Sequence, residues 1–220
     1  MRSYIRAFIV IAVGCVVVAL FRPTQEEPAA PILPAQADAH GAQTTLIRVP
    51  PSGPRIWYGA DHYPRLSLPD GQQEVVRSVL NITKPMTFGS FVWNDDGIPD
   101  GPLWVRVDLG KQLLSVFRGG HEIGSAVILY GATHKQTPTG NFPILEKQRD
   151  YHSRTYDAPM PFMLRLTNDG VAIHGSNVRE DWATHGCIGV PLDFARLLFS
   201  AAKKGDLVVI LGAEQGAGKA

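Results

Sequence analysis

Residues 103–130 have the sequence LWVRVDLGKQLLSVFRGGHEIGSAVILY. Apolar and polar side chains alternate from Leu103 to Leu109, and a period of two is typical of a strand with one buried face. Two more strands are expected over residues 112–117 and 123–130, with the glycines at 119 and 120 forming a tight turn between them. The stretch therefore predicts an antiparallel meander.

Strand patterns continue to the end of the chain. The expected strands cover residues 142–145, 163–166, 171–173 and 207–211. Between the last two, Pro191 suits a first helical turn, four apolar residues follow on one helical face, and Gly205 ends the segment; the four are Phe194, Leu197, Leu198 and Ala201. The sequence predicts a strand-rich α+β domain with one main helix.

Composition excludes one class of partner. The 220 residues carry 21 Lys and Arg against 20 Asp and Glu, so the formal net charge is +1. Binding to a nucleic-acid backbone depends on a concentrated positive field, which this balance does not supply. We therefore expect no nucleic-acid partner.

The amino terminus resembles an export signal. Arg2 and Arg6 precede an apolar run over residues 7–21. The run is shorter than the about 20 residues of a membrane span, yet no small-residue cleavage site follows it. Residues 1–21 are thus expected to be a signal or anchor segment, with the anchor preferred, and the run is the only expected membrane contact. Cys15 is interpreted as an apolar residue of this segment rather than a lipoprotein cysteine.

The intervening chain divides by composition. Residues 22–54 are rich in proline and alanine and are expected to be a tether, and residues 213–220 a flexible tail. Residues 55–101 are expected to be an extension that packs on the main domain through its aromatic residues, including Trp57, Phe91 and Trp93. Asp70-Gly71-Gln72-Gln73 predicts the start of a short helix over the valines that follow.

Cys187 is the strongest candidate for chemistry. Its only possible disulfide partner within the chain is Cys15, in the targeting segment, so a disulfide is not expected. His174 and His185 lie near it in sequence, and an imidazole can accept the proton of an attacking thiol. Sequence alone does not choose between the two histidines. The same three side chains could instead bind zinc, although a single residue separates His185 from Cys187 and no acidic base is evident.

Four motifs in order resemble the catalytic domain of the L,D-transpeptidases, the YkuD-type family. They are the strand pair at 105–118, Thr137-Pro138-Thr139-Gly140-Asn141-Phe142, His174-Gly175, and Thr184-His185-Gly186-Cys187-Ile188. The resemblance covers about residues 103–211 and implies a catalytic domain over residues 102–212 with a mixed β-sandwich fold. It also implies a location in the bacterial periplasm or cell envelope, no cofactor and no metal.

The resemblance further implies an acyl-transfer reaction on peptidoglycan stem peptides. Cys187 would attack a tetrapeptide donor, release D-alanine and form a thioester, which the side-chain amine of an acceptor stem would resolve. His174 would move the proton, oriented by the carbonyl of Gly175 or Ser176, and His185 would support the site. Backbone N–H groups around Gly186 would form the oxyanion hole. Substrate contacts are expected at Gly175, Ser176, Thr184 and Gly189.

One position departs from the family pattern. Gly189 stands where relatives carry arginine or asparagine, so a contact to substrate is missing or is made by another residue. Arg154, Arg165 and Arg179 are candidates for that contact. The alternatives to transfer are hydrolysis by the same residues, as in an L,D-carboxypeptidase or endopeptidase, the zinc site, and a wall-binding module without catalysis.

Overall fold

The computed structural model describes residues 55–131 and 135–212. The predicted targeting segment (1–21), tether (22–54) and tail (213–220) lie outside these residues. All described residues belong to one compact unit. No helix in the described ranges has the length and apolar content needed to cross a bilayer.

Eight strands form the larger sheet, in the order β1-β4-β8-β7-β6-β14-β9 with β5 also paired to β8. Their bounds are β1 Ile56–Trp57, β4 Ser78–Val79, β5 Phe91–Trp93, β6 Leu103–Asp108, β7 Leu113–Arg118, β8 His121–Val127, β9 Gly140–Pro143 and β14 Leu207–Leu211. The meander β6-β7-β8 is antiparallel, as predicted. Gly119 and Gly120 turn the chain between β7 and β8 with φ of 55° and 86°, a region that favours glycine.

The second sheet has four strands in the order β10-β11-β12-β13. They are β10 Glu146–Ser153, β11 Ala158–Arg165, β12 Ala172–Ser176 and β13 Ile188–Pro191. β12 and β13 are parallel, whereas the other pairs are antiparallel. Helix α1 (Leu192–Ala201) begins directly after β13, so Pro191 occupies the N-cap position rather than the first helical turn predicted from sequence. The expected strand-rich α+β class with mixed sheets and one main helix is confirmed.

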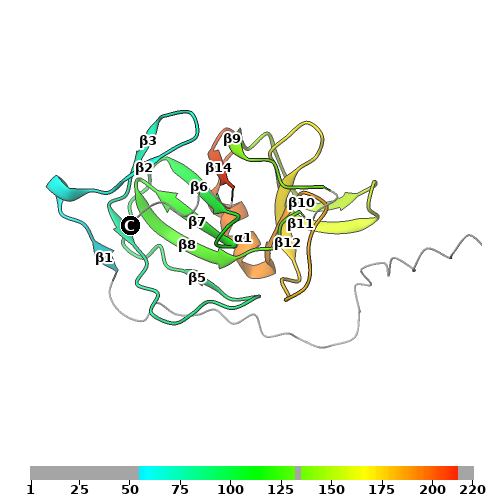
Figure 1. Ribbon diagram of the computed structural model, residues 1–220, viewed down its shortest axis with the longest axis horizontal. Helices are drawn as coiled ribbons and strands as arrows, with labels where there is room; N and C mark the ends of the chain where they lie inside the picture. The colour runs from blue at the N-terminus through cyan, green and yellow to red at the C-terminus, as the bar shows by residue number, and fades with distance from the viewer. Residues whose placement is uncertain (1–54, 132–134, 213–220) are drawn as a thin grey trace, which may run out of the picture. The chain divides into compact units, whose positions relative to one another are not determined.

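The core lies between the two sheets and α1. In Figure 1, α1 appears between the strands β6–β8 and the strands β10–β12. Phe194 of α1 is fully buried and meets Phe91 and Trp93 of the larger sheet edge to face, at centroid distances of 5.8 and 5.5 Å. Apolar residues of both sheets, such as Val105 and Ile173, complete one contiguous cluster. This core fixes β12, which carries His174, and β13, which begins directly after Cys187.

The prediction of a helix near residue 70 is wrong. The segment forms a hairpin of β2 (Arg65–Ser67) and β3 (Gln73–Val75), preceded by the 3-10 turn η1 (Ala60–His62). The Asp70 carboxylate accepts a hydrogen bond from the Gln72 N–H at 3.0 Å, and Gly71 has a φ of 82°. The same Asp that could cap a helix thus closes a turn, and the β-branched residues after it favour strand.

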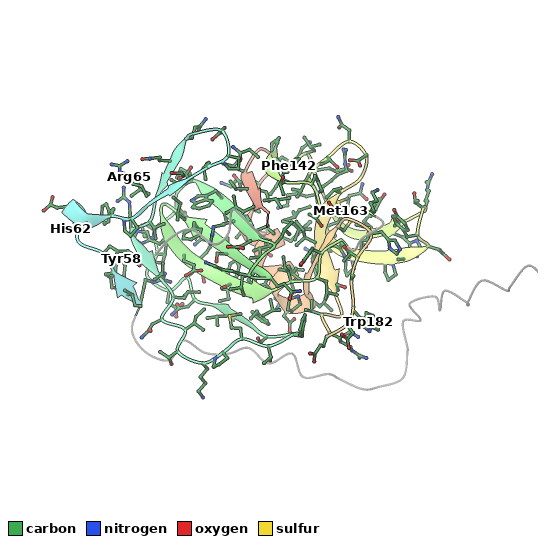
Figure 2. All side chains as sticks on the ribbon, viewed as in Figure 1. Tyr58, His62, Arg65, Phe142, Met163 and Trp182 are labelled. Carbon is green, nitrogen blue, oxygen red and sulfur yellow. The ribbon has the colours of Figure 1, made fainter. Side chains whose placement is uncertain are left out.

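The extension packs on the larger sheet, but not through every aromatic residue predicted. Phe91 and Trp93 are buried, and Tyr58 (labelled in Figure 2) packs against the cluster that contains Trp104. Trp57 is 60% exposed, and its ring makes an edge contact with the ring of His121. Within residues 55–101, β1, β4 and β5 are strands of the larger sheet, whereas β2 and β3 form a separate two-stranded sheet.

Candidate active site

Strand register brings His174 and Cys187 to one face of the four-stranded sheet. Ile173 pairs with Ile188, and both side chains point into the core. Side chains alternate between the faces of a strand, so His174 and the residue before Ile188 point to the opposite face. Cys187 indeed packs there against Met163 and Ala172. Cys187 comes directly before β13, so this register places its side chain diagonally across from that of His174 in β12.

The turn that presents Cys187 is fixed by the backbone conformation of Gly186 and by the hydrogen bonds of Thr137. Gly186 has a φ of 100°, a conformation that favours glycine. The buried hydroxyl of Thr137 donates to the Gly186 carbonyl at 3.0 Å and accepts from the Gly131 N–H at 2.9 Å. A trans peptide places its N–H opposite its carbonyl. The Cys187 N–H therefore points away from Thr137.

His174 is held in one orientation and one tautomer. Its Nδ1 lies 2.9 Å from the Gly175 carbonyl oxygen, which can only accept, so Nδ1 carries the proton. In the neutral ring Nε2 then keeps a free lone pair. Burial lowers the pKa of His174 below its usual value of 6.5, and the bond to Gly175 opposes this shift. The imidazole is thus a neutral base at neutral pH.

The thiol of Cys187 is held in its neutral form. Burial raises its pKa; a backbone hydrogen bond at Ala172 and the charge of Lys135 lower it, while the charge of Asp169 adds to the rise. Its Sγ lies 3.8 Å from the Gly170 carbonyl oxygen, within the range of a weak S–H hydrogen bond. With His174 also neutral, the resting pair is thiol and imidazole. Ionisation of the sulfur must then accompany its attack on a substrate.

A cavity of about 180 Å³ opens beside the thiol. Cys187 and His185 line it together with Lys135, Tyr156 and Asp169. The ring of His185 stacks on Tyr156 at a centroid distance of 4.7 Å and an interplanar angle of 18°. Tyr156, in the loop between β10 and β11, thereby supports His185 at the wall of the cavity.

The four residues predicted to contact substrate do not line this cavity. Gly175, Ser176 and Gly189 belong to β12 and β13. The hydroxyl of Thr184 donates to the Cys187 carbonyl, and the backbone N–H of Thr184 donates to the Tyr130 carbonyl. Thr184 therefore stabilises the turn that presents Cys187. Substrate contacts at these four positions stay a prediction.

None of the three candidate arginines lines the cavity. Arg165 forms an ion pair with Glu146 at 2.8 Å. Arg179 donates to the Asn177 side chain and lies over the ring of Trp182, at the edge of the molecule in Figure 2. Neither of them lines the cavity, and Arg154 does not line it either. The cation at this site is Lys135, which the sequence analysis did not identify.

The departure at Gly189 has a steric reason. A Cβ atom on Gly189 would lie 2.9 Å from the Cβ of Ser176 and 3.4 Å from that of Leu129. The Gly189 backbone is also fixed, because its N–H and carbonyl both bond to Leu129, at 2.9 and 2.8 Å. An arginine or asparagine could enter here only if Ser176 moved.

We expect Gly189→Ala to lower the free energy of unfolding by about 1–3 kcal/mol, because the added methyl overpacks this contact. Urea unfolding measures the loss, with an unchanged m-value as evidence that only stability has changed. Gly59→Ala is the matched control, since Gly59 has a φ of −67° and nothing within 4 Å of an added Cβ. Equal stability of the two variants would contradict the crowding described at Gly189.

The described residues contain no group of three His, Cys, Asp or Glu side chains placed to hold one metal ion. The zinc alternative therefore has no ligand set within them. A thiol on a cavity wall, a neutral imidazole with a fixed tautomer on the same sheet face, and a backbone N–H at the turn are groups of the kind that nucleophilic acyl transfer requires.

Residues 102–210 match the model of the L,D-transpeptidase catalytic domain, the YkuD family. Through this segment the chain belongs to that family. Among curated proteins none matches the chain at a significant level.

Three solved structures of L,D-transpeptidases are similar to part of this chain. One from Stackebrandtia nassauensis is 25% identical, with 53% of this chain and 60% of that chain covered and a TM-score of 0.48. One from Mycobacterium tuberculosis H37Rv is 19% identical, with 50% and 57% covered and a TM-score of 0.46. L,D-transpeptidase 1 of Mycobacterium tuberculosis is 26% identical, with 50% and 61% covered and a TM-score of 0.44. The match thus spans less than two thirds of each of these chains.

Proposed function

We propose that this protein is a cysteine-dependent L,D-transpeptidase that forms or remodels crosslinks between peptidoglycan stem peptides. Membership of the L,D-transpeptidase catalytic domain family supports the reaction class. The observation that carries the mechanism is the placement of Cys187 at the cavity wall, on the same sheet face as the oriented base His174. The apolar run at residues 7–21 favours export to the cell envelope, and the segment is the proposed membrane contact.

The proposed reaction has two halves. In the first, Nε2 of His174 takes the thiol proton while Sγ of Cys187 bonds to the donor carbonyl carbon. The C–N bond then breaks, and His174 returns the proton to the amine of the departing D-alanine. In the second half, the acceptor amine attacks the thioester and gives its proton to His174, and the C–S bond breaks. The sulfur leaves as a thiolate and regains that proton.

The backbone geometry around Cys187 supports stabilisation of the negative charge that develops on the oxygen of the attacked carbonyl. The Gly186 carbonyl is held by Thr137, so the Cys187 N–H is turned away from that bond. An N–H fixed before the reaction begins can stabilise a developing oxyanion without reorganisation. Hydrolysis differs from transfer only in the use of water in the second half, so the hydrolase alternative shares every residue described.

Product analysis separates the two activities. With disaccharide-tetrapeptide as donor and acceptor, we expect the full-length protein to yield crosslinked dimer and free D-alanine, measured by mass spectrometry. Bare tripeptide in place of dimer would identify a hydrolase. No product of either kind from the folded protein would contradict the proposed function.

A further inference from the structure

The side chain of Lys135 runs over the turn that carries the proposed nucleophile. A Cβ atom built on Gly186 would lie 3.4 Å from Cγ and 3.6 Å from Cδ of Lys135, so the lysine stem passes over the residue before Cys187. Its backbone is equally close to the site, because a Cβ on Gly131 would lie 2.2 Å from the Lys135 carbonyl oxygen. The stem of Lys135 thus packs over Gly186, and the backbone of Lys135 packs against Gly131.

The ammonium group of Lys135 has no carboxylate partner among residues 55–131 and 135–212. Its Nζ lies 6.0 Å from the ring centroid of Tyr156, which also stacks on His185 at the wall of the cavity. An unpaired cation at a concave site attracts an anion more strongly than one on an open surface. The cavity therefore presents a positive group beside the thiol.

Asp169 supplies the opposing charge. It lines the same cavity, and the hydroxyl of Thr167 donates to its carboxylate, which lowers the pKa of Asp169 and keeps it ionised. Lys135 lowers the pKa of Cys187 and Asp169 raises it, so both charges are felt at the sulfur. Replacing one or the other should change the field at Cys187 in opposite directions.

We propose that Lys135 binds the α-carboxylate of the D-residue that leaves the donor, in place of the side chain that Gly189 lacks. This inference rests on the proposed function, in which the leaving residue carries a free carboxylate one residue from the attacked carbonyl. Lys135 then positions the donor, and Asp169 limits the attraction of anions to the cavity.

The field at Cys187 can be measured without peptidoglycan. Iodoacetate and iodoacetamide are of similar size and alkylate the same thiolate, but only the first carries a carboxylate. Both alkylation rates are proportional to the fraction of Cys187 that is thiolate. The ratio of the two rates therefore does not depend on that fraction and reports the charge near the sulfur. Alkylation is measured by mass spectrometry on the tryptic peptide of residues 180–196, which contains Cys187 and not Cys15.

In the full-length protein, Lys135→Met is expected to lower the iodoacetate-to-iodoacetamide ratio about tenfold, the order for one nearby charge at a partly exposed site. Lys135→Arg should retain the ratio, and Asp169→Asn should raise it. Lys204→Met is the matched control, because this exposed lysine does not line the cavity. A ratio unchanged within twofold in Lys135→Met would overturn the inference. If Lys135→Met does not fold, an unchanged ratio in Asp169→Asn would overturn it.

Substrate recognition is tested with the tetrapeptide donor and its C-terminal amide. The unaltered protein should prefer the free acid, and Lys135→Met should lose that preference mainly through a higher KM. An equal acid preference in Lys135→Met would overturn the assignment of the carboxylate. A shifted alkylation ratio in a protein without transfer or hydrolysis would contradict the proposed function alone and leave the cation site established.

Discussion

Replacing Cys187 by alanine is expected to lower the rate of D-alanine release from a tetrapeptide donor by at least ~10³-fold, because the variant has no atom that can form the acyl-enzyme. The fold should persist. The side chain lost is small and packs at the margin of the cluster around Met163 and Ala172, not in the main core. D-alanine release is measured by chromatography under single-turnover conditions.

Cys187→Ser is the matched companion to this variant. It keeps a nucleophilic atom in the same place, but a hydroxyl ionises far less readily than a thiol, so the rate should again fall steeply. Circular dichroism should show both variants folded. Release within tenfold of the unaltered protein in Cys187→Ala would contradict the thiol mechanism.

Replacing His174 by alanine is expected to lower the rate of acyl-enzyme formation about 10²–10⁴-fold, the usual contribution of a general base. The pH dependence distinguishes this role from a structural one. In the unaltered protein the pKa of His174 lies below 6.5, since burial disfavours the charged ring. The base form is therefore complete at neutral pH, and activity should fall only as the pH drops through that lowered pKa.

In His174→Ala the thiolate must form without a base. Burial raises the pKa of Cys187, so the residual rate should climb about tenfold per pH unit through neutral pH and level only above the usual thiol value of about 8.5. His185→Ala is the comparison, since that ring supports the cavity wall through Tyr156. A His174→Ala profile as flat near neutrality as that of the unaltered protein would contradict the assignment.

The resting charge state is the part of this site that sequence does not disclose. Two histidines near a cysteine suggest an ion pair of thiolate and imidazolium. Burial instead shifts the pKa of Cys187 upward and that of His174 downward, and both shifts favour the neutral forms. These shifts depend on how β12 and β13 pack, which the residue types alone do not determine.

Strands with an alternating apolar pattern or a continuous apolar run were predictable, and a polar strand was not. The alternation at residues 103–109 gives β6, and the apolar run at 207–211 gives β14. β10 has no such pattern, because most of its side chains are polar or exposed. It is a strand because its backbone pairs with that of β11. Local propensity also failed at Asp70, where one carboxylate suits a helix cap and a hairpin turn equally well.

The sequence points to Cys187 as the proposed nucleophile, but it does not disclose the residues around the cavity. Cys187 and its histidines share one short stretch of sequence, whereas Lys135, Tyr156 and Asp169 reach the cavity from three separate loops. An isolated lysine or aspartate in a loop carries no sequence signal beyond solvation. Gly189 was noted as a departure, and the position of Ser176 gives its physical cause.

The acyl-enzyme itself can be observed by intact-protein mass spectrometry. The full-length protein is mixed with tetrapeptide donor in the absence of acceptor, quenched in acid within seconds, and mapped by proteolysis. We expect a mass increase equal to the donor minus D-alanine, located on the peptide of residues 180–196 and removed by hydroxylamine, as a thioester requires. The same adduct in Cys187→Ala, or D-alanine release from the unaltered protein without any adduct under single-turnover conditions, would contradict a thioester on Cys187.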